Sequence, residues 1–392
     1  MKRPTQAVIL AGGIGERLTP LTLHCPKPLI RINNKPFVKY LVEDLALQGF
    51  KKVIFLVGYK AEEFRNYFGT GSEFGIKIDY IETPVEAETG KRIKAAQHVL
   101  EDIFFLLYGD NYWPFDFDKL WSNYITCGKS TQLVTYNNED NYSSSNIKLG
   151  PDDNVLKYDK TRKSDDVHAV DLGFIIIKRD LIESFPDEDV SFEKYLYPEL
   201  VKKNDLHAYR TDHRYYSITN IQRLSITEKF LNGPKYIFLD RDGVINKRPG
   251  PAMYVKSWDD WEWEDGAIQS IVTLTKNKYR IIIITNQPGI GREIITQPEL
   301  EHIHVRMKSV LKEHGGEIEH IYYCPHGWND NCNCRKPKPG LLLRAHRDYH
   351  INLMKTPYIG DSDKDQEAAE RVGTPYYMVN SDIKLIDIVN GL

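Results

Sequence analysis

The first half of the chain alternates short apolar runs with longer segments in which apolar residues recur at helical spacing. The runs at 52–59 (KVIFLVGY) and 103–111 (IFFLLYGDN) predict buried strands, and the segment 36–50 predicts an amphipathic helix. This alternation predicts a mostly parallel sheet covered by helices on both faces. Two short alternating strands around a Pro-Asp-Asp-Asn turn predict a hairpin at 146–160.

The second half repeats the opening pattern with different polar residues. Three apolar runs, YIFLD from 236, RIIIITN from 280 and TPYIGD from 356, each end in a polar residue. In open α/β sheets the carboxyl ends of strands form the ligand crevice, so we expect these endings to converge. An Asn-Gly-Pro break at 232–234 marks the boundary. The sequence therefore predicts two doubly wound α/β domains, 1–231 and 236–392, joined by a linker at 232–235.

Composition narrows the classes of partner. The 392 residues are 41% hydrophobic and 27% charged, with a formal net charge of -3, which argues against nucleic acid or an anionic membrane as the main partner. No apolar run reaches the roughly 18 residues of a transmembrane helix, and the apolar run near the N-terminus is too short for a secretory signal. Five cysteines, three of them clustered, predict a reducing, cytoplasmic location.

The stretch 324–337 (CPHGWNDNCNCRKP) concentrates metal-binding residue types. Four side chains suit tetrahedral zinc in a closed, structural site: Cys324, His326, Cys332 and Cys334. The alternative is a loop with three free thiols. A zinc-stapled loop would fix the direction of Arg335 and Lys336, and two fixed cations suit a phosphate dianion.

Carboxylates at the predicted strand ends suggest phosphoryl chemistry. Asp240 could attack phosphorus while Asp242 handles protons. Asp361 and Asp365 offer ligands for Mg²⁺, and Thr285 could hydrogen-bond the transferring group.

The ordered set D-x-D-G, T-N-Q, R-K-P and G-D-x-x-x-D resembles the haloacid-dehalogenase phosphatases over roughly 236–380. It is most similar to the capless, zinc-containing branch of heptose 1,7-bisphosphate phosphatases and histidinol-phosphatases. The resemblance implies that Asp240 is the nucleophile, Asp242 the general acid/base and Lys336 the lysine that steadies phosphate. It also implies Mg²⁺ binding by Asp240, Asp361 and the carbonyl of Asp242, and substrate contacts from Asn286 and Arg335. Only five residues separate His326 from Cys332, as in histidinol-phosphatases, which leaves the sugar open.

A glycine-rich turn in the first half offers a nucleotide cradle. Glycines at 12, 13 and 15 allow backbone N–H groups to approach a triphosphate, and Arg17 and Lys27 offset its charge. The pattern G-G-x-G-x-R-L-x-P-L-T with P-K-P resembles the sugar-1-phosphate nucleotidylyltransferases over roughly 6–230. That resemblance implies a second Mg²⁺ on Asp110.

Three departures from that family concern substrate and metal. AETGKRI stands at 87–93 where relatives read L-G-T-G-G-A, and Lys160 is the equivalent of the lysine in their E-K-P segment. Asp171 stands where relatives contact sugar hydroxyls. Ser217 occupies the place of their second metal-binding aspartate, and a hydroxyl is a poor substitute for a carboxylate on Mg²⁺.

The two halves fit one reaction sequence. The resemblances imply that the phosphatase removes the 7-phosphate of D-glycero-D-manno-heptose 1,7-bisphosphate and that the transferase joins the remaining 1-phosphate to a nucleotide from GTP. Alternatives are another sugar or polyol phosphate with CTP or dTTP, or an active phosphatase with a regulatory, nucleotide-binding first half. The partners expected are sugar phosphates and a nucleoside triphosphate, and a homo-oligomer is compatible with the sequence. His302 and His304 are expected on the solvated face of a helix, and 258–266 (WDDWEWEDG) as a packed turn.

Overall fold

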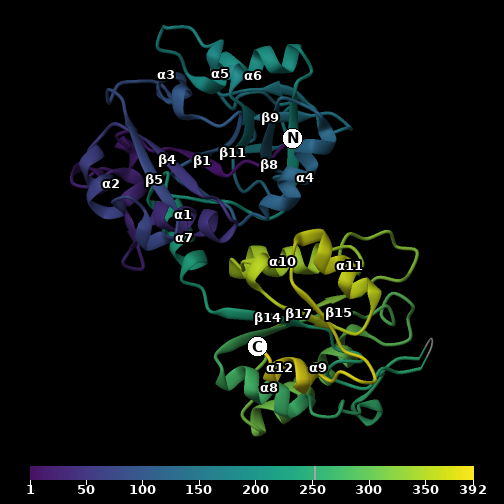
Figure 1. Cartoon of the computed structure of the whole chain (residues 1–392). Coiled ribbons are helices and arrows are strands. Elements are labelled where there is room, and N and C mark those ends of the chain that lie inside the picture. The colour runs from purple at the N-terminus through teal and green to yellow at the C-terminus, as the bar shows by residue number, and fades with distance from the viewer. Residues whose placement is uncertain (251–252) are drawn as a thin grey trace. The chain divides into compact units, whose positions relative to one another are not determined.

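Two separate sheets organise the chain, one in each of the units Met1–Leu231 and Asn232–Leu392 (Figure 1). The computed structural model describes residues 1–250 and 253–392. Among these residues, no helix combines the length and apolar character needed to cross a membrane.

The sheet of the first unit has seven strands in the order β12-β8-β11-β6-β1-β4-β5. β11 runs antiparallel to both of its neighbours, and every other adjacent pair is parallel. The predicted mostly parallel sheet is therefore confirmed. In chain order its strands are β1 (Gln6–Leu10), β4 (Lys52–Val57), β5 (Lys77–Glu82), β6 (Ile103–Tyr108), β8 (Thr131–Tyr136), β11 (Val170–Lys178) and β12 (Leu206–Thr211).

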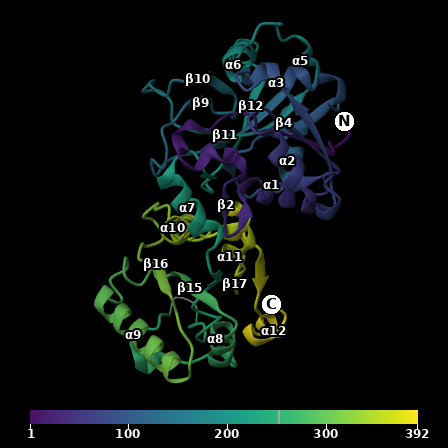
Figure 2. The same ribbon diagram turned by 90° about the vertical axis from the view of Figure 1, so that its left-hand side faces the viewer.

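Helices cover both faces of this sheet because alternate strand residues point to opposite sides. Ala7 and Ile9 of β1 pack with the helices α1, α2, α4 and α7, whereas Val8 and Leu10 pack with α3, α5 and α6. Figure 2 shows the second group above the sheet and α1 and α2 below it. The helices are α1 (Phe37–Leu47), α2 (Ala61–Phe68), α3 (Thr89–Ala95), α4 (Phe117–Cys127), α5 (Asp180–Glu183), α6 (Phe192–Lys202) and α7 (Ile221–Leu231).

Short antiparallel pairs lie outside the main sheet. The predicted hairpin forms from β9 (Ile147–Leu149) and β10 (Val155–Tyr158). β7 (Asn111–Tyr112) pairs with β13 (Tyr216–Ser217), and β2 (Arg31–Ile32) pairs with β3 (Lys35–Pro36). The β7–β13 pair brings the predicted Ser217 next to the turn that carries Asp110.

The second unit is built on a parallel sheet of five strands in the order β16-β15-β14-β17-β18. The strands are β14 (Lys235–Leu239), β15 (Tyr279–Asn286), β16 (His320–Cys324), β17 (Tyr358–Gly360) and β18 (Tyr376–Met378). β14 thus begins at the last residue of the predicted linker. Because β14 is flanked by β15 and β17, the three predicted polar endings meet at one edge.

Five helices form the outer layers of the second unit. Tyr236 and Phe238 pack with α10 and α11, and Ile237 and Leu239 pack with α8, α9 and α12 on the other face. The helices are α8 (Ala267–Lys276), α9 (Gln297–Glu313), α10 (Gly340–Tyr349), α11 (Asp363–Val372) and α12 (Leu385–Asn390). The tryptophans of 258–266 pack on one another, with the rings of Trp258 and Trp261 stacked 5.4 Å apart, in agreement with a packed turn.

Candidate active sites

A buried lysine and two carboxylates form the centre of the second unit's site. Asp240 follows the last residue of β14, and its Oδ1 lies 2.9 Å from Nζ of Lys336. Lys336 is 4% exposed, and its Nζ also lies 2.5 Å from Oδ1 of Asp365. The same Nζ donates to the carbonyl oxygen of Ile284 and to the hydroxyl of Tyr358, each at 2.9 Å. Four oxygens therefore surround the ammonium group and hold it beside Asp240.

Asp365 is held differently from Asp361. Its Oδ1 accepts from Lys336 and Tyr358, and its Oδ2 accepts from the hydroxyl of Ser362 at 2.6 Å. Asp361 instead pairs with Arg248, whose Nη2 lies 2.5 Å from its Oδ1. The partner of Asp361 is therefore an exposed arginine that a metal ion could displace. The partners of Asp365 are buried or partly buried side chains.

Mutual repulsion among the carboxyl groups makes this site suited to a cation. Burial raises the pKa of Asp240 to about 8; Lys336 opposes the shift, while Asp365, Asp361 and Asp242 add to it. Burial likewise raises the pKa of Asp361 to about 6, against the effect of Arg248. One carboxyl oxygen from each of Asp240, Asp361 and Asp365 lies within 4.8 Å of the others. These oxygens are ligands that Mg²⁺ prefers, so the residues present fit the ion.

The turn after β14 leaves no room for a side chain at Gly243. Its φ is 88°, in the left-handed region, and a Cβ there would lie 1.8 Å from Oδ2 of Asp361. Glycine therefore allows the two strand ends to approach closely enough to share a site.

Asp242 is surrounded by hydrogen-bond donors. Nη2 of Arg241 donates to its Oδ1 at 2.8 Å, and Asn246 and Gln287 each donate at 2.9 Å. Burial alone would raise the pKa of Asp242, but Arg241 and these hydrogen bonds outweigh it and lower the pKa below its ordinary value. The geometry therefore stabilises the carboxylate form of Asp242, the form that can accept a proton.

His304 is buried, so the prediction of a solvated His304 is wrong. It lies on α9 with Leu300 and Met307, and this spacing of four and three residues could have placed it on the buried face. Its Nε2 lies 3.3 Å from Nη1 of Arg241. Burial and then Arg241 lower the pKa of His304 to about 3, so the ring is neutral and accepts from the guanidinium. The predicted site lacked both Arg241 and His304.

Four further residues predicted to act in the second unit, Thr285, Asn286, Arg335 and Lys336, line one cavity of about 450 Å³ together with Asp240 and Asp242. Thr285 is buried, and its Oγ1 accepts from Gln287 at 3.0 Å. Asn286 and Lys336 exchange two hydrogen bonds through the amide side chain of Asn286 and the backbone of Lys336. Arg335 donates to the carbonyl oxygen of His326 at 3.1 Å, and both it and Asn286 line the cavity.

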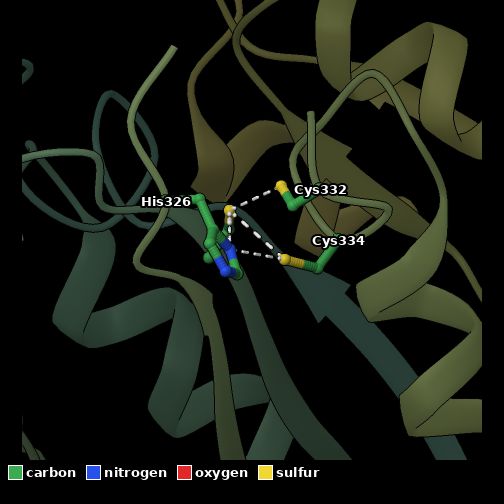
Figure 3. Close-up of side chains that lie close together, drawn as sticks. His326, Cys332 and Cys334 are labelled. Carbon is green, nitrogen blue, oxygen red and sulfur yellow. Dashed lines mark hydrogen bonds between the residues drawn. The ribbon is translucent and has the colours of Figure 1, made fainter. Parts of the chain in front are cut away.

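Three sulfur atoms and one ring nitrogen converge at the end of β16 (Figure 3). Sγ of Cys324 lies 3.7 Å from Sγ of Cys332, 3.4 Å from Sγ of Cys334 and 3.6 Å from Nδ1 of His326. Nδ1 of His326 lies 3.2 Å from Sγ of Cys334. A tetrahedral zinc site has S–S and S–N separations of roughly 3.5–3.8 Å. The four residues thus fit zinc without leaving a position open for substrate.

The glycine turn of the first unit lies at one of two cavities that share lining residues. One, of about 320 Å³, is lined by Gly12, Gly13, Gly15, Lys27 and Val85, and the other is about 1000 Å³. Arg17, Tyr108 and Asp110 line both. Nζ of Lys27 forms an ion pair with Oδ2 of Asp110. The structure therefore brings the predicted cradle residues together. Lys27 lies where its ammonium group could contact a phosphate bound near Asp110.

Arg92 belongs to this cradle, although no pattern in the sequence predicts it there. It is 4% exposed, and its guanidinium donates to the hydroxyl of Thr83 at 2.6 Å and to the carbonyl oxygens of Val85 and Gly12 at 2.8 and 3.3 Å. A Cβ at Gly12 would lie 2.1 Å from its Nη1. Arg92 lies in the segment AETGKRI, which differs from the family pattern. Its hydrogen bond to the carbonyl oxygen of Gly12 thus stabilises the glycine turn.

Ser217 lies beside Asp110, as the resemblance to the sugar-1-phosphate nucleotidylyltransferases implies. It pairs with Asn111 across β7 and β13, and the following N–H, of Ile218, donates to the carbonyl oxygen of Asp110 at 3.1 Å. Its hydroxyl is 2.7 Å from that of Thr219. Two hydroxyl groups, those of Ser217 and Thr219, therefore stand at the place where the resemblance implies a second metal carboxylate.

Lys160 and Asp171 line the larger cavity with Glu193. Nζ of Lys160 lies 3.0 Å from Oε2 of Glu193, and Oδ1 of Asp171 accepts from the N–H of Gly173 at 2.8 Å. Burial raises the pKa of Asp171 to about 6; the hydrogen bond from Gly173 opposes this, and Glu193 adds to it. These groups offer both donors and acceptors to sugar hydroxyls.

Comparison with known proteins separates the two units. Residues 6–156 match the family model described as nucleotidyl transferase, and residues 235–387 match the model described as polynucleotide kinase 3 phosphatase. The D-glycero-beta-D-manno-heptose-1,7-bisphosphate 7-phosphatase of Pseudomonas putida is 40% identical over 147 residues, 38% of this chain and 83% of that protein. The probable D-glycero-D-manno-heptose-1,7-bisphosphate 7-phosphatase of Thermoplasma volcanium is 37% identical over 146 residues, 37% of this chain and 98% of that protein.

A solved structure matches the first unit. The crystal structure of HddC from Yersinia pseudotuberculosis complexed with GMP-PN is 26% identical, with a TM-score of 0.50, and the match covers 57% of this chain and 99% of that chain. Two separate sets of relatives thus correspond to the two units.

Proposed function

We propose the function of this chain from one premise: through its second unit it belongs to the family of D-glycero-beta-D-manno-heptose-1,7-bisphosphate 7-phosphatases, and its first unit contains a nucleotidyl transferase domain. The chain is an enzyme that combines a phosphatase and a nucleotidyltransferase. It removes the 7-phosphate of D-glycero-D-manno-heptose 1,7-bisphosphate and then joins the heptose 1-phosphate to GMP from GTP. The presence of both catalytic sets in one chain carries this proposal, because the product of the first reaction is the substrate of the second.

The phosphatase reaction uses Asp240 as a nucleophile. A carboxylate oxygen of Asp240 forms a bond to phosphorus while the bond from phosphorus to the sugar oxygen breaks, and Asp242 in its protonated form donates a proton to that oxygen. Water then attacks the phosphorus of the aspartyl phosphate, the bond from phosphorus to the Asp240 oxygen breaks and phosphate leaves. Asp242 accepts a proton of that water, which leaves it protonated for the first step of the next turnover. The hydrogen bonds around Asp242 favour its charge in this second step, since they lower the pKa of its carboxyl group.

Cations and hydrogen-bond donors balance the phosphoryl charge. Lys336 and Thr285 face the transferring group, and Asn286 and Arg335 contact substrate across the same cavity. Asp240, Asp361 and the backbone carbonyl of Asp242 would hold Mg²⁺, which supplies neutralisation of the phosphoryl oxygens. Asp365 positions Lys336 rather than ligating metal, because its oxygens accept from Lys336, Tyr358 and Ser362.

The zinc cluster has a structural role in this proposal. Zn²⁺ held by Cys324, His326, Cys332 and Cys334 would close the loop that leads into Arg335. Because Arg335 donates to the carbonyl oxygen of His326, binding of Zn²⁺ by these four residues would hold the Arg335 side chain toward the cavity.

The transferase reaction is a displacement at the α-phosphorus. An oxygen of the sugar 1-phosphate forms the new bond to phosphorus and pyrophosphate leaves, so the site needs positioning and charge neutralisation. Backbone N–H groups at Gly12, Gly13 and Gly15 and the side chain of Arg17 hold the triphosphate. Lys27 neutralises the two reacting phosphates, and Asp110 would hold Mg²⁺. Lys160 and Asp171 bind the sugar; the HddC structure with GMP-PN supports a guanine nucleotide.

Pyrophosphate release tests the transferase half of the proposal, and release of phosphate from D-glycero-D-manno-heptose 1,7-bisphosphate tests the phosphatase half. GTP, CTP, ATP, UTP and dTTP are each supplied with Mg²⁺ and both anomers of D-glycero-D-manno-heptose 1-phosphate, and release is expected with GTP. Release with CTP or dTTP instead of GTP would show that the proposed nucleotide donor is wrong. Release only with another sugar phosphate would show that the proposed sugar is wrong.

An inactive first unit is a second candidate, because two hydroxyl groups stand where a second metal carboxylate is expected. GTP binding that changes the phosphatase rate without pyrophosphate release would favour this regulatory role. Asp240→Asn separates the activities: it should abolish phosphate release and leave nucleotide binding intact.

A further inference from the structure

Trp328 is a large aromatic side chain at the mouth of the phosphatase cavity. It is 62% exposed, although it lines the cavity together with Tyr254. It belongs to the loop between His326 and Cys332, and the sequence alone gave it no role. A tryptophan left largely in water beside a catalytic cavity suggests that its apolar surface is covered when substrate binds.

Arg292 holds the two aromatic side chains together. Its guanidinium carbon lies 4.6 Å from the centre of the Trp328 ring, and its Nη1 donates to the hydroxyl of Tyr254 at 2.7 Å. The cation over the ring face adds an attraction that orders the indole. Tyr254 and Trp328 come from different loops, so Arg292 joins these loops into one wall of the cavity.

The cavity has polar and aromatic parts with different chemistry. Asp240 and Lys336 lie in the part that accepts the phosphoryl group, whereas Tyr254 and Trp328 offer ring surface. A pyranose ring has C–H groups that form an apolar face, and covering apolar surface contributes roughly 25 cal/mol per Å². An aromatic wall therefore fits the sugar ring, while the charged part fits the phosphate.

We propose that Trp328 is a specificity-determining residue of the phosphatase, whose indole ring, with Tyr254, receives the sugar ring of the substrate. The proposal rests on the proposed phosphatase function but applies to any phosphorylated sugar that the site hydrolyses. Trp328 follows the zinc-ligand candidate His326 by two residues, so the same loop that directs Arg335 also presents the indole. Arg292 is a positioning residue in this arrangement.

Steady-state kinetics of the full chain tests the proposal. Wild type, Trp328→Ala and Trp328→Phe are compared on D-glycero-D-manno-heptose 1,7-bisphosphate and on acetyl phosphate, which has no sugar ring. We expect Trp328→Ala to raise KM for the heptose about tenfold with little change in kcat, and to lower the ratio of kcat/KM for heptose over acetyl phosphate about tenfold. Trp328→Phe should restore most of this ratio. Arg292→Ala should raise KM two- to threefold, roughly what loss of ordering alone gives.

A matched control removes an exposed aromatic residue elsewhere in the second unit. Tyr377, on β18, is 40% exposed, and Tyr377→Ala should leave the ratio unchanged. Zinc content, measured per chain, separates loss of the ring from damage to the loop. An unchanged ratio in Trp328→Ala, or an equal loss with both substrates, overturns the proposal. If wild type hydrolyses a different sugar phosphate, the proposed substrate is wrong and the same ratio is measured with that sugar; if it hydrolyses only acetyl phosphate, both proposals fail.

Discussion

Replacement of Lys336 by methionine should lower both the stability and the phosphatase activity of the second unit. Both losses should be larger than those caused by removing any exposed charged side chain of this unit. Methionine approximates the length of the side chain but removes the ammonium group. Asp240 and Asp365 would then lie together in a buried site without the cation that separates them. The carbonyl oxygen of Ile284 would lose its donor as well.

The magnitude follows from the burial and the two short contacts. At an effective dielectric constant of about 20, one ion pair at 2.9 Å has a Coulomb energy of roughly 6 kcal/mol before desolvation is counted. Removing one partner of a buried pair costs about 3–5 kcal/mol in practice. Protonation of Asp240, whose pKa is already about 8, limits the loss, so we expect the free energy of unfolding of the second unit to fall by about 3 kcal/mol.

Activity should also fall, because Asp240 loses the cation beside its carboxylate and the phosphoryl group loses a fixed positive charge. Loss of one such preorganised group lowers kcat about 10²–10³-fold. Phosphate release and denaturant unfolding are measured for Lys336→Met and for Lys312→Met, an exposed residue on α9. If Lys336→Met kept more than a tenth of the phosphatase activity, the proposed role of Lys336 would be refuted. If Lys312→Met lost as much activity as Lys336→Met, the loss could not be assigned to the position of Lys336 in the site.

Three further perturbations test the other sites. Cys332→Ser should lower zinc per chain and destabilise the second unit by several kcal/mol, since structural zinc contributes folding free energy; normal melting with full zinc would contradict the ligand set. Ser217→Asp should lower the Mg²⁺ concentration for half-maximal pyrophosphate release about tenfold, and an unchanged Mg²⁺ dependence would show that the hydroxyl does not limit metal binding. Burial raises the pKa of Asp171 to about 6 from an ordinary 3.8, so its protonated form favours folding and this contribution is lost as pH rises through 6. Asp171→Asn should therefore stabilise the first unit by about 1–3 kcal/mol at pH 7 and by almost nothing at pH 4, as measured by denaturant unfolding; a gap that does not vary with pH would contradict this.

The strand ends were predictable from sequence because each motif directly follows an apolar run. Asp240, Thr285 and Asp361 come from three neighbouring strands of one sheet, and parallel topology alone brings such ends together. The four candidate zinc ligands were predictable for a similar reason, since they lie within eleven residues and in one loop.

Side-chain partners were less predictable because they depend on contacts between distant segments. Asp365 is a metal-ligand candidate by spacing, yet in the folded unit its carboxylate anchors Lys336 and accepts from Tyr358 of β17. Arg92 contacts the glycine turn from a segment about eighty residues later, and no local pattern signals that burial. His304 was wrongly predicted on the solvated face, although its helical spacing from Leu300 and Met307 would have placed it inward.

The close approach at Gly243 links two positions that are far apart in the chain. Even alanine would place its methyl carbon 1.8 Å from a carboxyl oxygen of Asp361, and the backbone there is also unfavourable for any side chain. Loss of the Asp361 carboxylate would remove this clash, but the positive φ would still favour glycine at position 243. Sequences of this family that keep Asp361 should therefore keep glycine at 243, whereas glycine at 243 alone does not report that the carboxylate is retained.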